Sequence, residues 1–259
     1  MIRAGLRGLT ASVLLLTTAA QAEVLTVEGV YPADSDGAAA MKTIAVESFG
    51  GSDGADLAIR IEDALRAVEI DGRPYFRVLP SASGGADGVL RGTATAEIKR
   101  ERYTEHSQLE QATDSRCEDN SSEQRSPETV VRELTGRIAG RLRGALAPTW
   151  RRESIRVLED RKGLSREDGE KFKNALRLTK TDAGAACRQW QAIADANPGH
   201  AVTLFNIGLC DEAAGNLDGA ERLYREAAQT SRAGNVGDGL GRIAARRRAS
   251  RQLAAHSAR

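Results

Sequence analysis

The sequence predicts an α+β protein: an N-terminal α/β sandwich, in which two helices cover a mixed sheet, followed by an α-helical array of hairpins and a C-terminal capping helix. Two patterns predict this fold. Short β-branched runs alternate with amphipathic segments over residues 23–160, whereas residues 161–259 show only helical spacing of apolar and small side chains. The 259 residues are 41% hydrophobic, so the chain can bury a sizeable core in one or two domains.

The overall composition argues against nucleic-acid binding. Charged residues make up 28% of the chain, but the formal net charge is only +1, so no overall positive field attracts a polyanion. Aromatic residues make up only 4%, which argues against a stacking platform for single strands or sugars. We therefore expect no nucleic-acid partner.

The N-terminus has the pattern of an export signal. Arg3 and Arg7 precede an apolar run, residues 9–20, which is too short to span a bilayer. The run ends in Ala20-Gln21-Ala22, a small-x-small cleavage pattern. The sequence therefore predicts a signal peptide over residues 1–22, cleaved after Ala22, and a periplasmic mature protein; an uncleaved membrane anchor is the alternative. No cysteine follows the cleavage site, so we expect no lipoprotein anchor and at most peripheral membrane association.

The α/β domain is predicted over residues 23–160 from alternating strand and helix patterns. Short β-branched or alternating runs predict strands at 24–32, 43–49, 75–80, 88–105 and 150–160, the last of which should return to the sheet. A helix after the glycine-rich loop carries Leu57, Ile61, Leu65 and Val68 on one face. A second helix opens at Pro127, and its predicted face consists of Val130, Val131, Leu134, Ile138, Leu142 and Leu146. The polar stretch 107–126 is predicted to be disordered.

Two helical hairpins are predicted over residues 161–235. Gly208 lies inside an otherwise good helix, which usually marks a place where another helix approaches closely. Gly215-Asn216 supplies a helix stop, and residues 217–229 then form a second helix with one buried stripe. The hairpin resembles a tetratricopeptide repeat, with Leu204, Gly215, Ala220, Tyr224 and Ala227 at matching positions. A poorer copy precedes it, carried by Phe172, Ala175, Ala186 and Trp190.

The α/β domain resembles the periplasmic domain of the CsgG-like envelope proteins, which include a curli-secretion channel subunit and lipoproteins that activate penicillin-binding proteins. The matching stretches are "IAVESF", "LAIRIEDALRAVEIDGRPYFRVLP", "ADGVLRGTATAEIKRERY" and "IRVLEDRKGLS". Where that family has further strands, this chain has only the polar "HSQLEQATDSRCEDNSSEQRSPE". The combination with a short repeat array implies an exported bacterial protein that binds other envelope proteins.

The repeat resemblance implies a partner-binding groove. In such arrays the first helix of each unit lines a concave face, which here presents Val202, Phe205, Asn206, Leu209 and Glu212. Packing of these residues against neighbouring helices is the alternative. Successive helices of an array lie side by side, so Cys187 and Cys210 could pair in a disulfide; two buried thiols are the alternative. Cys117 is left over, as a free thiol or an intermolecular bridge.

A second candidate surface lies on the C-terminal helix, within residues 236–259. Its arginines are Arg242, Arg246, Arg247, Arg248 and Arg251. We expect Leu240, Ile243, Ala244 and Leu253 to dock the helix as a cap and leave the arginines in solvent. A contact with an anionic lipid or an acidic partner is the alternative.

No catalytic motif in the sequence favours an enzyme, a cofactor or a metal. The loop "FGGSDGAD" lacks the lysine and hydroxyl residue of a phosphate-binding loop, and His106, His200 and His256 are scattered. The acidic pairs Glu62-Asp63 and Glu159-Asp160 are expected on solvated surfaces. We therefore expect a non-catalytic periplasmic adaptor or scaffold in cell-envelope assembly or secretion, of unknown oligomeric state. The alternatives are a structural subunit of an outer-membrane assembly and a cell-wall hydrolase that uses the acidic pairs.

Overall fold

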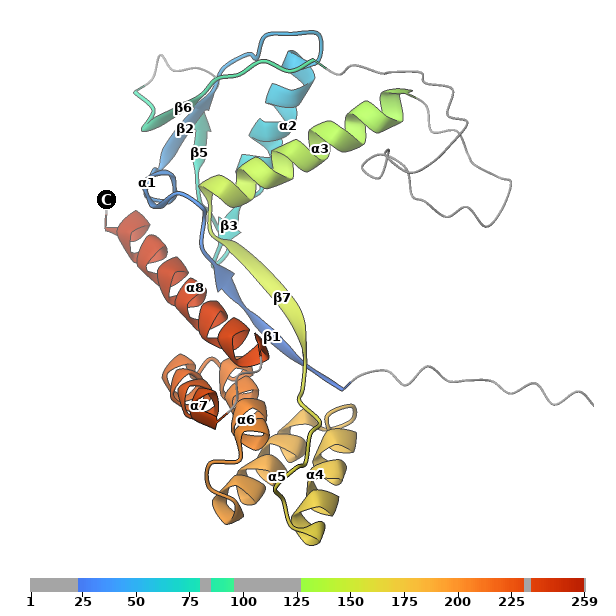
Figure 1. Ribbon diagram of the computed structural model, residues 1–259. Helices are drawn as coiled ribbons and strands as arrows, with labels where there is room; N and C mark the ends of the chain where they lie inside the picture. Colours follow the sequence, from blue (N-terminus) through green and yellow to red (C-terminus); the bar gives the residue numbers. More distant parts are fainter. Residues whose placement is uncertain (1–22, 80–84, 96–126, 231–233, 259) are drawn as a thin grey trace, which may run out of the picture.

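The computed structural model describes residues 23–79, 85–95, 127–230 and 234–258, and the protein is mixed α+β (Figure 1). The predicted signal peptide, the polar stretch 107–126, His106 and Cys117 lie outside the described residues. The elements are β1 (Val24–Tyr31), α1 (Asp36–Ala39), β2 (Thr43–Val46), α2 (Gly54–Arg66), β3 (Glu69–Ile70), β4 (Arg73–Pro74), β5 (Arg77–Leu79), β6 (Gly88–Leu90), α3 (Pro127–Leu146), β7 (Thr149–Arg156), α4 (Arg166–Leu178), α5 (Ala183–Ala196), α6 (Ala201–Ala213), α7 (Leu217–Thr230) and α8 (Gly234–Ser257).

The N-terminal part is a small parallel sheet with two helices against it. The strand order is β5-β2-β6, and β2 is parallel to both neighbours. Leu57, Ile61 and Leu65 of α2 are buried in this core, as their spacing predicts. The expectation of a mixed sheet is wrong for the described strands, because all three are parallel. In addition, β3 and β4, which are two residues long each, form a separate antiparallel hairpin.

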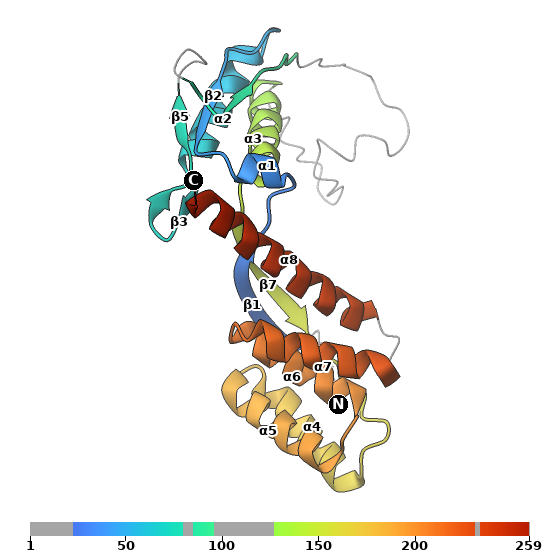
Figure 2. The ribbon, with the colours of Figure 1, turned by 90° about the vertical axis from the view of Figure 1, so that its left-hand side faces the viewer.

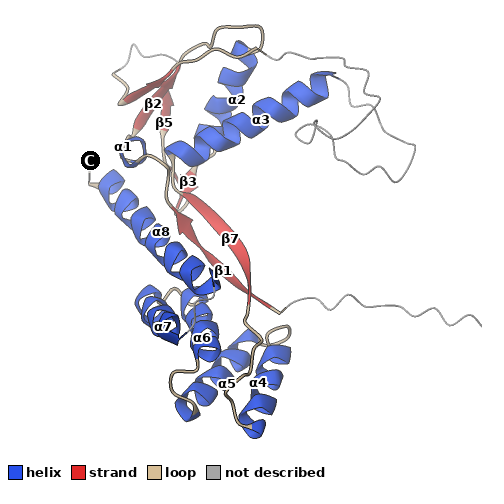
Figure 3. Cartoon of the chain, viewed as in Figure 1, coloured by secondary structure: helices blue, strands red, loops and turns tan. Residues whose placement is uncertain are grey.

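The last predicted strand does not return to this sheet. Residues 149–156 instead pair antiparallel with β1 along its whole length, from Tyr31 opposite Thr149 to Val24 opposite Arg156. This two-stranded ribbon lies between the sheet and the helical part (Figure 3). Its inner face buries Leu25 and Val27 in the same core as Phe205 and Trp190. The ribbon therefore belongs to the helical core, and apolar burial there explains its position.

The exposed face of α3 also differs from the prediction. Thr135 and Ala139 are its buried residues, whereas Leu134 and Ile138 remain 36% and 42% exposed. Leu142 and Leu146 are partly buried against the N-terminal core, so only the C-terminal half of the predicted apolar face reaches it.

Helices α4 to α7 pack in sequence order around a second core. Each consecutive pair is in contact, and Phe172, Trp190, Phe205 and Tyr224 are completely buried. Side chains cap the helices: Ser165 accepts from the Asp168 amide, and Asp182 accepts from the Ala185 amide. A Cβ atom on Gly208 would lie 2.6 Å from the Tyr224 ring, so another helix does approach closely here, as predicted, and that helix is α7.

Helix α8 spans both parts of the molecule. Figure 2 shows it running from beside α7, along the ribbon, to the N-terminal sheet. Ile243, near its middle, is buried in the helical core, and Leu253, near its end, packs against the N-terminal core. A single helix of 24 residues therefore ties the two cores together.

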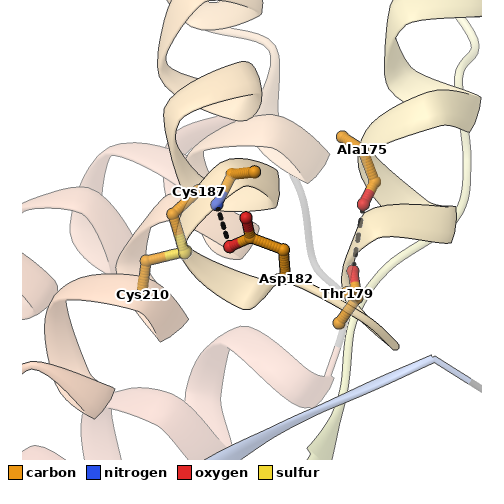
Figure 4. Close-up of a disulfide and its surroundings, with 6 residues drawn as sticks. Ala175, Thr179, Asp182, Cys187 and Cys210 are labelled. Carbon is orange, nitrogen blue, oxygen red and sulfur yellow. Dashed lines mark hydrogen bonds between the residues drawn. A yellow bond between two sulfur atoms is a disulfide. The ribbon is translucent and has the colours of Figure 1, made fainter.

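A disulfide joins α5 to α6. Of the two alternatives for Cys187 and Cys210, the structure has the bond, with an S–S distance of 2.05 Å and Cα atoms 6.0 Å apart (Figure 4). The bond closes a loop with a sequence separation of 23 residues. Closing such a loop restricts the unfolded chain and so stabilises the fold.

We expect reduction of this disulfide to lower the free energy of unfolding by about 3 kcal/mol, because the unfolded chain regains the entropy of the open loop. The measurement is urea denaturation of the Cys117→Ser variant with and without reductant. A variant that also carries Cys187→Ser and Cys210→Ser is the control, and its unfolding should not respond to reductant. Equal midpoints for the oxidised and reduced Cys117→Ser protein would contradict the expectation.

Candidate functional site

The predicted groove is filled by the chain itself. Phe205, Asn206, Leu209 and Glu212 are each 0% exposed, and only Val202 is partly accessible. The strand β1 and helix α8 contact α6. The prediction that this face is open to a partner is therefore wrong. The alternative expectation, that these residues of α6 pack against other parts of the chain, is confirmed.

Asn206 shows how the groove is occupied. Its side-chain amide donates to the carbonyl of Leu158 at 2.9 Å, and its side-chain carbonyl accepts from the Leu158 amide at 2.9 Å. The side chain thus pairs with the backbone in the way a neighbouring strand would. The segment that follows β7 lies where an extended peptide of a partner was expected, and Val157 beside it is 1% exposed.

Glu212 is the centre of a buried ionic cluster. Its carboxylate accepts from Arg242 at 2.8 and 3.0 Å and from the Tyr224 hydroxyl at 2.7 Å. Burial, reinforced by the Glu212 charge, raises the pKa of Tyr224 far above its usual value, so the hydroxyl stays protonated and donates. Arg246 donates to the backbone carbonyl of Glu212 at 3.0 Å. Among the described carboxylates only this one is buried.

Most of the arginines on α8 hold the helix in place. Beyond Arg242 and Arg246, Arg247 forms ion pairs with Asp218 and Glu221, and Arg248 pairs with Asp36 at 2.9 Å. Hydrogen bonds from Gln252 and Arg248 lower the pKa of Asp36. The expectation that the arginines face solvent is wrong for Arg242, whose side chain is 11% exposed, and for the partly buried Arg246. Arg247 and Arg248 each keep 37% of the side chain exposed, and their ion pairs lie at the surface. Arg251 is exposed and makes no ion pair or hydrogen bond with a described residue.

The acidic pairs lie in ion pairs and a turn, and Glu159 and Asp160 also line a depression of about 480 Å³ beside the start of α4. Glu62 and Asp63 both pair with Arg66, Glu159 pairs with Arg156, and Asp160 accepts from the Lys162 amide.

Within the described ranges, no group of three or more histidine, cysteine or acidic residues could hold a metal ion. No helix in those ranges is both long and apolar enough to cross a bilayer.

The outer face of the ribbon is the surface that sequence reasoning missed. By register, this face consists of Val24, Thr26, Glu28 and Val30 from β1 with Arg156, Ser154, Arg152 and Trp150 from β7. Trp150 is 64% exposed and lies opposite Val30. Val24 is 41% exposed, and Arg152 pairs with Glu28. No described strand pairs with the far edge of β7.

The composition of β7 indicates this surface. In the run "TWRRESIR", both alternating sets of residues include charged or polar side chains, so neither face of the strand is clearly apolar. A tryptophan in such a strand is not needed by a core on either side, which indicates a surface role.

Comparison of the chain with protein-family models, with curated proteins and with solved structures gave no match.

We expect loss of Arg242 to lower the free energy of unfolding by about 3 to 5 kcal/mol, because Arg242→Met leaves the Glu212 charge buried without its cation. Combining Arg242→Met with Glu212→Leu should cost much less than Arg242→Met alone, since the uncompensated charge is gone. Urea denaturation of both variants measures the difference. Arg251→Met, in solvent, is the matched control and should change stability by at most about 0.5 kcal/mol. A double variant that is as unstable as Arg242→Met would contradict the ionic explanation.

Proposed function

We propose that this protein is a non-catalytic periplasmic adaptor or scaffold that binds partner proteins in cell-envelope assembly or secretion, and that it binds them through the outer face of the β1–β7 ribbon. The predicted groove cannot serve, because its own chain fills it. The observation that supports the ribbon is Trp150, which is 64% exposed in a protein with only 4% aromatic residues.

Trp150 differs from every other described aromatic residue. Seven of them are at least 96% buried, from Trp190 at 0% exposure to Tyr31 and Tyr75 at 4%, and Phe49 is partly buried. Exposing a large apolar ring to water costs free energy that folding would otherwise recover. Tryptophan is the residue type most enriched in binding hot spots, where it is buried by the partner. A binding role accounts for its position on the surface.

The free edge of β7 offers a second kind of contact. An eight-residue strand with no described neighbour on one side has backbone groups that an extended segment of a partner can pair with. Arg151, Arg152 and Arg156 lie along this strand, and charges on an edge discourage pairing with unrelated strands. A partner segment that adds to β7 and covers Trp150 would use both features.

The resemblances to tetratricopeptide repeats and to CsgG-like domains favour an adaptor over an enzyme, and the predicted signal peptide supports a periplasmic location. Two alternative functions make different predictions. A structural subunit of an outer-membrane assembly would form large rings on a sizing column. A cell-wall hydrolase would need a carboxylate pair in a cleft, and the pairs considered from the sequence are held in ion pairs and turns.

We expect the signal peptide to be cleaved after Ala22 during export. The mature protein recovered from the periplasmic fraction should therefore begin at Glu23, which intact-mass measurement of the purified chain will show. A protein that keeps residues 1–22 and sediments with membranes would support the anchor alternative instead.

We expect Trp150→Ser to weaken partner binding about 30-fold, because a central tryptophan contributes about 2 kcal/mol or more to an interface. A photo-crosslinking amino acid at position 154, on the same outer face, first identifies the partner in envelope extracts. Titration with that purified partner then gives the dissociation constant. Ile59→Ser is the matched control, because Ile59 is 59% exposed on α2 and should not affect binding. Equal affinity of Trp150→Ser and the parent protein would move the binding surface elsewhere.

A further inference from the structure

A second surface feature lies where the end of α8 meets the N-terminal sheet. It is a depression of about 720 Å³ between the β3–β4 hairpin, the start of β5 and the last turns of α8. Its lining includes Lys42, Arg73, Arg77, Tyr75, Leu253 and His256. These residues come from segments far apart in the sequence, so the depression exists only in the assembled fold.

Three cations gather at this depression without acidic partners. Arg77 lies opposite Thr43 in the parallel sheet, and its amide donates to the Lys42 carbonyl at 2.8 Å, so Lys42 and Arg77 are neighbours. Arg73 comes from the adjacent hairpin. The side chains of these three residues form no ion pair or hydrogen bond within the described ranges. Asp71 is the one carboxylate in the lining, and the Asp87 carboxylate lies behind it, where it accepts from the Lys42 and Thr43 amides at 2.8 and 2.9 Å. Three cations against these two carboxylates leave a small excess of positive charge.

The wall of the depression is aromatic and aliphatic. The Tyr75 ring is 4% exposed and stacks on His256 with ring centroids 3.9 Å apart. Its hydroxyl donates to the Ala39 carbonyl, and burial raises the pKa of Tyr75 to about 12, so the ring carries no negative charge near neutral pH. The Nδ1 atom of His256 is buried and has no hydrogen-bond partner in the described part of the chain. Leu253 and Ile70 complete the wall.

We propose that this depression binds a phosphate-bearing anion through Arg73, Arg77 and Lys42, with its organic part against Ile70 and Leu253. Guanidinium groups bind phosphate oxygens in pairs of hydrogen bonds, and an ammonium adds a point charge. Three unpaired cations at one depression match the charge of a phosphate group better than that of a single carboxylate. The phosphate comes either from a free small molecule or from a lipid headgroup.

The site is independent of the proposed partner surface, because none of its residues belongs to the β1–β7 ribbon. A ligand here would contact both α8 and the sheet, so it would bind the assembled fold and stabilise it. Anion binding here and partner binding at Trp150 can therefore be tested separately.

The first test is isothermal titration of the mature protein with inorganic pyrophosphate at fixed ionic strength, alongside co-sedimentation with phosphatidylglycerol vesicles. We expect saturable binding to at least one of these probes, and the probe that binds identifies the source of the phosphate. The Arg73→Gln/Arg77→Gln variant should bind that probe at least about tenfold more weakly, since each lost charged hydrogen bond carries a penalty of that order. Both arginines are exposed, so the variant should keep its circular dichroism spectrum.

The matched control is Arg188→Gln/Arg222→Gln, which removes the same charge from exposed positions on α5 and α7. Its affinity should equal that of the parent protein. An equal loss in both double variants would show only a general effect of net charge and would overturn the site. Failure of the parent protein to bind either probe at millimolar concentration would overturn it as well.

Discussion

The arrangement of the molecule depends on one buried charge, the carboxylate of Glu212. A carboxylate that is fully removed from water needs a cation and further hydrogen-bond donors, and here Arg242 and Tyr224 supply them. Arg242 belongs to α8, so the requirement fixes where that helix crosses α6 and α7. With this crossing set, Arg246 lies over Gly29 of the ribbon, where a Cβ atom would come within 2.6 Å of its side chain.

The ribbon is held at both ends by the same kind of contact. Asn206 pairs with both backbone groups of Leu158, two residues beyond β7. Gln252 pairs in the same way with Ala33, two residues beyond β1, at 2.8 and 3.0 Å. Because the strands are antiparallel, these two amide side chains secure opposite ends of the ribbon. A two-stranded sheet is marginal by itself, so its order follows from α6 and α8.

Local structure was predictable wherever spacing within a few turns decides it. The face of α2, the turn between α6 and α7 and the close approach of a helix to Gly208 all follow from residues near one another in the sequence. The environment of α6 was misjudged, although the sequence holds the reason. Both of its neighbouring stripes are apolar, and a helix that is apolar on all sides is a central one, not the lining of an open groove.

Pairings over long distances could not be predicted from this sequence. Nothing in the alternating charges of "TWRRESIR" identifies β1 as its partner, more than 100 positions earlier. The arginines of α8 gave the pattern of a solvated face, because the acids that pair with them lie on α1, α6 and α7. The exposure of Trp150 likewise depends on the pairing of β7 with β1, which sets the face of the strand on which the ring lies.

The bond between Ala33 and Gln252 joins positions 219 residues apart, near the two ends of the described chain. As synthesis proceeds from the N-terminus, the first strand is made long before the helix that secures it. The inner face of β1 therefore stays incompletely covered until α6 and α8 have been made, because both helices pack on this strand. Assembly of the ribbon is thus a late step in folding, and removal of α8 would cost β1 part of its order as well.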